Sequence, residues 1–314
     1  MKQYQTLLFY KYVKLADAEE YAIRLLRFCK KIGIKCRILV GDEGINGSVS
    51  GTPELCKEFT DFVTSDERLS DVWFKVEWVD EPSFVKTHVR YRKEIVTLGD
   101  QTAHLDPNQT TGGYLEPERF LEMKDSDDVV ILDTRNIIEY ETGHFKNAIH
   151  LNIEAFRDLP NKVAALEPYK DKKILAYCTG GIRCEKATAF LMEQGFPEVY
   201  QLHGGILNYY QKTGGKDFDG KMYVFDNRIV TDVNDVNPTV ISACYICGTT
   251  TPRIVNCANP ECNLHAPMCE GCGEAYQGAC SSECKEHPRK REYNPKGYYV
   301  KPGHDVQPKC GCIG

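Results

Sequence analysis

Hydrophobic positions in the first 82 residues follow two different periods. Apolar residues that alternate with polar ones are typical of half-buried strands, and apolar residues at i, i+3, i+4 and i+7 are typical of a helix with one buried face. The pattern predicts six elements in the order strand, helix, strand, strand, helix, strand. They are a strand over 5–13, a helix over 17–33, strands over 35–40 and 46–50, a helix opened by Thr52 and Pro53, and a strand over 73–79.

This βαββαβ order is the split pattern of ferredoxin-like and acylphosphatase-like domains. We therefore expect residues 1–82 to form an α+β domain of this kind. Thr52 can accept a backbone N–H at the start of the second helix, and Pro53 suits the first helical position, so that boundary is well marked.

Residues 113–215 carry a different pattern, in which short apolar runs alternate with helical segments. Strands are predicted at 129–133, 149–153, 173–177 and 199–202, and a helix from Glu185 to Gln194. Alternating strands and helices predict an α/β domain with a parallel sheet covered by helices. Ligands bind such sheets at the carboxyl ends of the strands.

The remaining sequence completes a division into five parts. They are the domain at 1–82, a basic linker at 83–112, the α/β domain at 113–215, a connector at 216–240 and a loop-rich, cysteine-rich domain at 241–314.

The chain of 314 residues has a net charge of −6, which argues against an evenly basic nucleic-acid binder. It has no run of about 18 apolar residues and no signal-peptide pattern at its start, so we expect no membrane partner and a cytoplasmic location.

The strand predicted at 173–177 ends at Cys178, which opens a loop that holds Gly180, Gly181 and Arg183. Two glycines allow the backbone to curve and aim N–H groups at one point, and Arg183 adds a fixed positive charge. Such a field lowers the pKa of a thiol and favours the reactive thiolate. From residue types alone, Cys178 is a nucleophile or persulfide carrier, part of an anion-binding loop, or a buried structural cysteine.

Cys184 lies six residues beyond Cys178. It is a candidate resolving thiol for a sulfenic acid or persulfide on Cys178. The alternative is a small residue at the start of a packed helix.

The linker carries a basic stripe interrupted by apolar residues. At a strand period Lys86, His88, Arg90 and Arg92 share one side, and Lys93 follows them. One interpretation is a solvated strand face. The other is an RNA-binding track, in which Lys86, Arg90, Arg92 and Lys93 contact phosphates.

Ten of the fifteen cysteines lie after residue 240. Clustered cysteine pairs in a reducing compartment indicate metal binding, and eight thiolates would make two tetrahedral structural zinc sites. The first pair can join the third and the second the fourth, or neighbouring pairs can join in sequence. The alternative is a metal-free cluster or a set of oxidised thiols. The predicted ligands are Cys244, Cys247, Cys257, Cys262, Cys269, Cys272, Cys280 and Cys284.

Three motifs in order resemble a single rhodanese domain. They are Leu132-Asp133-Thr134-Arg135, the segment from Gly143 to Ile149, and the loop from Cys178 to Arg183. The resemblance implies that Cys178 is the active-site cysteine and can carry a persulfide. It implies that the substrate or anion loop, formed by Thr179, Gly180, Gly181 and Ile182, cradles the sulfur, and that Arg183 helps to bind an anionic substrate.

The whole chain resembles the rhodanese-domain-containing, oxygen-dependent tRNA uridine-34 5-hydroxylases. The residues that carry this wider resemblance are the βαββαβ domain, the turn from Glu43 to Gly47, the linker from Arg92 to Val96 and the cysteine-rich tail. It implies conversion of the wobble uridine to 5-hydroxyuridine in the anticodon region of tRNA. Molecular oxygen would be the co-substrate, the rhodanese cysteine would be required, and the electron donor is not identified by the sequence.

The sequence has no dinucleotide-binding fingerprint, and no flavin or nucleotide motif accompanies the loop. Two hypotheses for Cys178 stay open: covalent attack at C6 of uracil, which makes C5 nucleophilic toward oxygen, and a persulfide role. Three functional classes compete. They are an RNA-modifying oxidoreductase, a sulfurtransferase that passes a Cys178 persulfide to an acceptor, and a zinc-dependent interaction module with a relic rhodanese domain.

Overall fold

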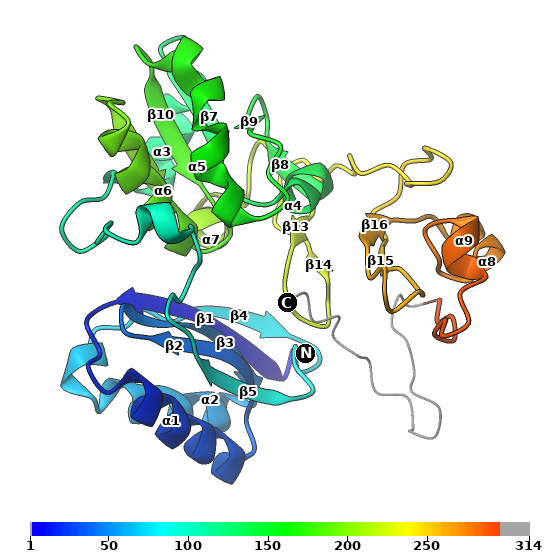
Figure 1. Cartoon of the computed structure of the whole chain (residues 1–314), viewed down its shortest axis with the longest axis horizontal. Coiled ribbons are helices and arrows are strands. Elements are labelled where there is room, and N and C mark those ends of the chain that lie inside the picture. Colours follow the sequence, from blue (N-terminus) through cyan, green and yellow to red (C-terminus); the bar gives the residue numbers. More distant parts are fainter. Residues whose placement is uncertain (1, 296–314) are drawn as a thin grey trace. The chain divides into compact units, whose positions relative to one another are not determined.

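In the computed structural model, residues 2–295 are described. By their packing they divide into two compact units (Figure 1). The first contains Met1–Asn136 and Asn147–Thr213, and the second contains Ile137–Lys146 and the chain from Gly214 onward. Among the described residues, no helix has both the length and the apolar composition needed to cross a membrane.

The N-terminal part of the first unit is a five-stranded sheet with the order β4-β1-β3-β2-β5. Helices α1 and α2 pack against one of its faces (Figure 1). The side chain of Thr52 accepts a hydrogen bond from Leu55 N and Pro53 opens α2, as the sequence predicts. The elements are β1 (Tyr4–Tyr12), α1 (Ala18–Ile32), β2 (Lys35–Gly41), β3 (Gly44–Gly51), α2 (Pro53–Thr64), a 3-10 turn at Glu67–Leu69, β4 (Lys75–Val79) and β5 (Thr87–Tyr91).

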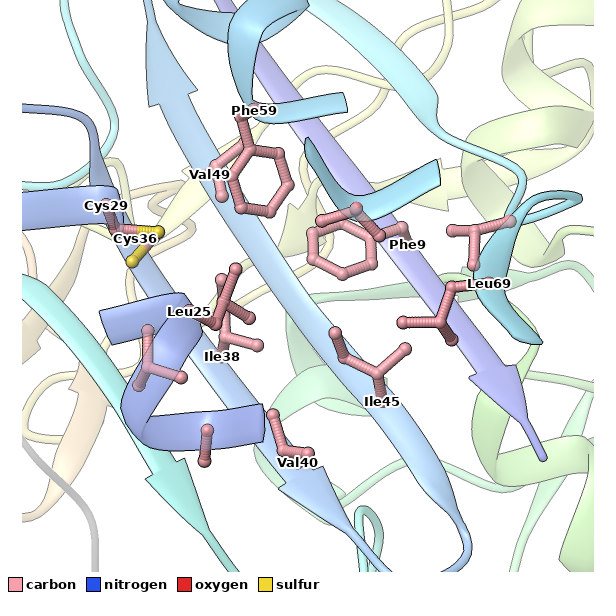
Figure 2. Packing of buried hydrophobic residues seen from close by; sticks show 14 of the residues in the cluster. Phe9, Leu25, Cys29, Cys36, Ile38, Val40, Ile45, Val49, Phe59 and Leu69 are labelled. Carbon is pink, nitrogen blue, oxygen red and sulfur yellow. The ribbon is translucent and has the colours of Figure 1, made fainter. Parts of the chain in front are cut away.

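The core of this sheet lies on its helix-covered face. Figure 2 shows Phe9 of β1 and Phe59 of α2 among aliphatic side chains such as Ile45 of β3. The two phenylalanine rings are 5.5 Å apart, centroid to centroid. Because side chains alternate along a strand, Leu8 and Tyr10 point to the opposite face, which is free of α1 and α2.

The central part of the first unit is a second five-stranded sheet with the order β6-β11-β10-β7-β9. All of its strand pairs are parallel, which confirms the predicted α/β arrangement. Helix α6 packs against β10 and β11, and α7 packs against β11 and α3. The elements are β6 (Gly113–Leu115), α3 (Pro117–Met123), β7 (Val129–Asp133), β9 (Ile149–His150), α5 (Leu159–Lys162), β10 (Lys173–Tyr177), α6 (Ile182–Glu193), β11 (Val199–Leu202) and α7 (Gly205–Thr213), with 3-10 turns at Asp100–Thr102, Phe156–Asp158 and Val163–Tyr169.

The second unit is built from short elements with a small core. Its strands form three two-stranded sheets, β12-β8, β13-β14 and β15-β16. Four of the cysteines take part in a small apolar cluster around Val255 and Met268. The elements are α4 (Ile137–Thr142), β8 (Gly143–Phe145), β12 (Phe218–Gly220), β13 (Met222–Tyr223), β14 (Val230–Thr231), β15 (Ile254–Asn256), β16 (His265–Pro267), α8 (Glu270–Ala275) and α9 (Ser282–Lys285).

The structure differs from the sequence expectation at three boundaries. Part of the stretch expected as a linker, Thr87–Tyr91, is strand β5 and pairs in parallel with β2. Residues 137–146 pack with the second unit, because β8 pairs with β12. Helix α6 begins at Ile182, not near Glu185, so Arg183 lies on its first turn.

Candidate active site and metal centres

Cys178 is the first residue after β10, and α6 begins four residues later at Ile182. The N–H of Gly181 donates a hydrogen bond of 3.1 Å to the Cys178 Sγ. Gly181 has a φ of 106°, which other residues rarely adopt, and a Cβ there would lie 2.8 Å from the Tyr10 hydroxyl. The loop therefore needs glycine at this position to aim its N–H at the sulfur.

The surroundings of Cys178 favour its thiolate. Burial raises the pKa of Cys178, but a hydrogen bond from Cys184 and the charge of Arg183 outweigh it and bring the pKa down to about 5. Backbone N–H groups of the loop act in the same direction. Arg183 is itself nearly buried, and its Nη2 donates to Thr179 Oγ1 over 3.2 Å, which fixes the guanidinium beside the loop. At neutral pH the sulfur is therefore a thiolate, the form that acts as a nucleophile.

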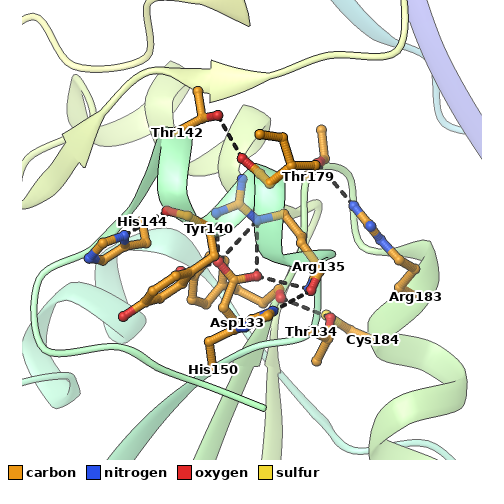
Figure 3. Close-up of polar contacts among 12 residues, drawn as sticks. Asp133, Thr134, Arg135, Tyr140, Thr142, His144, His150, Thr179, Arg183 and Cys184 are labelled. Atoms are coloured by element: carbon orange, nitrogen blue, oxygen red, sulfur yellow. Dashed lines mark hydrogen bonds and ion pairs between the residues drawn. The ribbon is translucent and has the colours of Figure 1, made fainter. Parts of the chain in front are cut away.

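Cys184 is the proton-bearing partner of this thiolate. Burial, together with the neighbouring Cys178, raises the pKa of Cys184 well above its ordinary value. Its sulfur lies 3.7 Å from Thr134 Oγ1 at the end of β7 (Figure 3). Cys184 is thus placed to donate a hydrogen bond to Cys178. This geometry offers an alternative to the resolving-thiol hypothesis.

The Cys184 hydrogen bond leads to a pH prediction. In Cys184→Ala the thiolate of Cys178 loses a donor, so its pKa rises and the acid limb of the activity profile moves to higher pH. A hydrogen bond to a charged group is worth about 1.5–3 kcal/mol, or about one to two pH units. Cys184→Ser keeps a donor and should stay close to the native profile. Equal loss of activity in both variants would instead support a resolving thiol.

A buried ion pair braces the strand beside the cysteine loop (Figure 3). Asp133 accepts hydrogen bonds from Arg135 Nε and Nη2, at 2.9 and 2.6 Å, and from the Tyr177 hydroxyl at 2.7 Å. Thr134 Oγ1 donates to the Tyr177 carbonyl at 3.0 Å, which ties β7 to the end of β10. Asp133 therefore has a structural role in this arrangement.

The start of helix α7 holds the loop from its other side. Ile206 N donates to the Cys178 carbonyl at 3.0 Å, and Leu207 N donates to the Thr179 carbonyl at 3.2 Å. Gly205 permits this approach, because a Cβ there would lie 2.5 Å from the Cys178 carbonyl oxygen. The start of the loop backbone is therefore fixed before any substrate binds.

The outer face of the N-terminal sheet covers the cysteine loop. A Cβ at Gly180 would lie 2.5 Å from Leu8 Cδ2, so the side chain of Leu8 rests on that glycine. Tyr10 contacts Gly181 in the same way, and the Tyr12 hydroxyl donates to the Ile182 carbonyl at 3.3 Å. Cys178 is fully buried beneath this cover.

Glu185 links the cover to the central domain. Its buried carboxylate accepts hydrogen bonds of 2.9 Å from the hydroxyls of Tyr10 and Tyr114. Gln201 Nε2 donates to it at 3.1 Å and Thr111 Oγ1 at 3.0 Å. Sequence reasoning missed both Tyr10 and Glu185 as site residues. A signal was available, because β1 is apolar on both faces and such strands are covered on both.

The four predicted RNA contacts are all exposed, at or near β5. Lys86 precedes this strand, Arg90 lies on it, and Arg92 and Lys93 follow it. Strand register places Arg90 opposite Leu39, Leu39 opposite Asn46, and Asn46 opposite Tyr10. Directly opposed residues share a face, so Arg90 lies on the same face as the cover of Cys178, about 14 Å away across three strand spacings.

The eight predicted metal ligands form two groups in space. Within each group the ligand atoms all lie within 4.8 Å of one another. The first and third pairs come together, and the second and fourth, which is the crossed arrangement of the two that the sequence left open. The groups are Cys244, Cys247, Cys269 and Cys272, and Cys257, Cys262, Cys280 and Cys284.

The donor set fits zinc in both groups. Four sulfurs at about 2.3 Å from a tetrahedral zinc lie about 3.8 Å apart. The sulfurs of Cys247 and Cys269 are 3.7 Å apart, those of Cys262 and Cys280 3.6 Å, and those of Cys280 and Cys284 3.8 Å. Closed four-cysteine sites of this kind suit a structural metal and leave no position for a substrate.

Three family models match successive parts of the chain. Residues 4–95 match the UPF0176 acylphosphatase like domain, residues 116–212 match the Rhodanese-like domain, and residues 219–285 match the model described as Rhodanase C-terminal. The first two ranges contain the two sheets of the first unit except for strand β6, which lies just before the second range.

Whole-length relatives share all three parts. A protein of Cytophaga hutchinsonii is 52% identical over 301 residues, which is 96% of this chain and 96% of that protein. A protein of Streptococcus agalactiae is 47% identical over 300 residues, 93% of this chain and 92% of that protein, and one of Streptococcus pyogenes is equally similar. All three carry the name tRNA uridine(34) hydroxylase. The chain belongs to the family of the tRNA uridine(34) hydroxylases.

Proposed function

We propose that this protein hydroxylates C5 of uridine 34 in tRNA and that Cys178 is its catalytic residue. The observation that carries the proposal is the thiolate-stabilising loop at the end of β10, in a chain whose full-length relatives carry the hydroxylase name. The sulfurtransferase alternative rests on the loop alone. It leaves the sheet that covers the loop without a role.

The chemistry starts with the Cys178 thiolate. Its lone pair forms a bond to C6 of uracil, and the C5–C6 π electrons move toward C5 and the C4 oxygen, giving an enolate that is nucleophilic at C5. In the overall reaction one atom of O₂ becomes the C5 hydroxyl. The other atom is reduced to water with two electrons and two protons from an external reductant. Loss of the C5 proton and of the thiolate returns the free cysteine.

The loop residues have supporting roles in this proposal. The N–H groups of Gly181 and Arg183, with the charge of Arg183, hold the sulfur as a thiolate until the base arrives. Because Cys178 is fully buried, the uracil reaches its sulfur only after part of the cover over the loop has moved.

The test of the proposed function is nucleoside mass spectrometry of tRNA from a strain that lacks the gene. We expect loss of 5-hydroxyuridine and of the wobble nucleosides made from it, with recovery when the gene is returned. Unchanged hydroxylation with lost thiolation would instead support sulfur transfer.

We also propose that the exposed basic residues at β5 contact the RNA backbone. Lys86, Arg90, Arg92 and Lys93 follow one edge strand, and Arg90 shares its face with the residues that cover Cys178. A tRNA whose anticodon reaches the cysteine loop can extend its phosphates along this face.

Arg90→Ala should therefore weaken tRNA binding and make it less sensitive to salt. Loss of one phosphate contact lowers the slope of log K against log salt by about one. Fluorescence anisotropy under anaerobic conditions measures binding without turnover. Arg27→Ala is the matched control, because Arg27 is an exposed arginine on α1, the helix that covers the opposite face. An Arg90 variant that keeps the native salt slope would count against this contact.

The cysteine-rich part is proposed to hold two structural zinc ions in the crossed arrangement. Zinc there would supply folding energy to a segment with a small apolar core, and it would take no part in the reaction.

We also propose that the chain is organised as an acylphosphatase-like, a rhodanese and a zinc domain. A cytoplasmic location, where tRNA is modified, is part of the same proposal.

A further inference from the structure

Lys75 is a buried lysine on the sheet face that covers the cysteine loop. It opens β4 and lies directly opposite Leu8 of β1. Only 4% of its surface is exposed. Its Nζ lies over two aromatic rings, 4.2 Å from the ring centroid of Trp73 and 5.0 Å from that of Tyr10. Its ammonium group is therefore held by ring faces.

Among residues 2–295, no hydrogen-bond acceptor or carboxylate pairs with the Lys75 ammonium. The contrast with Lys186 is direct, since that buried lysine reaches Glu43 at 2.8 Å, Glu94 at 3.7 Å and the Val96 carbonyl at 3.0 Å. Burial lowers the pKa of Lys75 to about 8, and the negative charges that oppose this shift belong to Cys178 and Glu185. An ammonium that is largely withdrawn from water and has no protein acceptor is costly and suits a site that receives an anionic oxygen.

The position of Lys75 is set by the same contacts that cover the loop. Leu8, its neighbour across the strand pair, rests on Gly180, and Tyr10, whose ring lies under the ammonium, rests on Gly181. The ammonium therefore lies on the face that covers the cysteine loop, near enough for the charge of Cys178 to act on it. The ring of Trp73 beside the ammonium is 40% exposed, and an exposed aromatic ring is a surface on which a base can stack.

We propose that Lys75 is a catalytic residue whose ammonium group binds O4 of the substrate uracil and stabilises the enolate formed when Cys178 adds to C6. The inference rests on the proposed function. In this step the S–C6 bond forms, the π bond between C5 and C6 breaks, and the negative charge of the thiolate moves to O4. The ammonium offsets the charge where it arrives. A preorganised donor acts most strongly in such a water-poor site.

A phosphate contact is the competing role for a lysine near RNA. Phosphates bind exposed cations such as Arg90, whereas Lys75 is enclosed by aromatic side chains that fit a base. The two roles differ in kinetics. Loss of a phosphate contact weakens tRNA binding, while loss of an enolate contact slows the chemical step and leaves binding nearly intact.

The first test compares Lys75→Met, Lys75→Arg and the control Lys11→Met, which removes a lysine that pairs with Asp71. We expect Lys75→Met to lower kcat by about 100-fold or more, the usual effect of losing one oxyanion donor. The Kd for tRNA, measured without oxygen, should stay within about threefold. Lys75→Arg should recover part of the rate, and Lys11→Met should be close to native. A Lys75→Met variant with native kcat and weakened tRNA binding would overturn the proposal.

The second test isolates the addition step from oxygen. Reversible addition of a thiolate to C6 lets the C5 hydrogen exchange with solvent, so tRNA incubated anaerobically in D₂O with the native protein should gain deuterium at C5 of uridine 34. Lys75→Met should slow this exchange by about the same factor as kcat. No exchange with the native protein would overturn covalent addition and the Lys75 role with it. Exchange that is equally fast in Lys75→Met would overturn the Lys75 role alone.

Discussion

Replacement of Cys178 by alanine is expected to abolish hydroxylation of uridine 34. The variant lacks the thiolate that the loop is arranged to stabilise, and loss of a nucleophile lowers turnover by about 1,000-fold or more. Nucleoside mass spectrometry of tRNA from a deletion strain that carries the variant measures the effect. The fold should persist, because alanine is smaller than cysteine and the loop backbone is held from α7.

Cys56→Ala is the matched control, since Cys56 is a buried cysteine on α2 that packs in the N-terminal core. It should support native levels of modification. A Cys178→Ala strain that restores 5-hydroxyuridine would refute the catalytic role assigned to this residue.

Mass spectrometry of the intact protein separates the two roles considered for Cys178. A trapped Cys178–RNA adduct supports addition to C6. A persulfide that is required for turnover supports the alternative, in which the outer sulfur projects beyond the buried Sγ. Turnover by protein that holds no persulfide would exclude the alternative.

Removal of zinc is expected to unfold the cysteine-rich part of the chain. Structural zinc contributes an apparent free energy of about 10–16 kcal/mol in small zinc peptides, far more than the small cluster around Val255 and Met268 can supply. Elemental analysis should find two zinc ions in each native chain, one for each four-cysteine group. Addition of a strong chelator should remove both and abolish the thermal transition of this part.

Single replacements give a sharper version of the same test. Cys269→Ala removes a ligand of the first group and should lower the zinc content, whereas Cys36→Ala alters a buried cysteine outside both groups and should leave it at two. A Cys269→Ala protein that retains two zinc ions and its native melting behaviour would contradict the assignment.

Local patterns predicted most of the secondary structure, because hydrophobic periodicity and caps act over a few residues. The change from a strand period to a helix period along residues 1–82 predicted β1 to β4 and both N-terminal helices. The apolar run 173–177 predicted β10. Strand β5 was expected as linker, although a solvated strand face was one interpretation of its charges. Val89 is its one buried core residue, and an edge strand with a charged face resembles a solvated linker.

Contacts between distant segments could not be predicted from the sequence. The loop at Cys178 could be predicted because its glycines and arginine are close together in the chain. The residues that cover the loop could not, because Leu8, Tyr10 and Lys75 come from strands of another sheet. The spacing of the cysteine pairs predicted eight ligands, but spacing within a pair carries no information about which pairs meet.

The crossed order of the cysteine groups has a consequence for metal exchange. The chain that closes the first group, from Cys247 to Cys269, contains both residues of the second pair, and the chain from Cys262 to Cys280 contains both residues of the third. The two closed loops are therefore interlocked along the sequence. Release of either ion frees a segment that carries ligands of the other, so the ions should leave together, in one sigmoidal step of a chelator titration. A protein truncated after residue 275 would retain all four ligands of the first group but only Cys257 and Cys262 of the second, and it should lose this coupling.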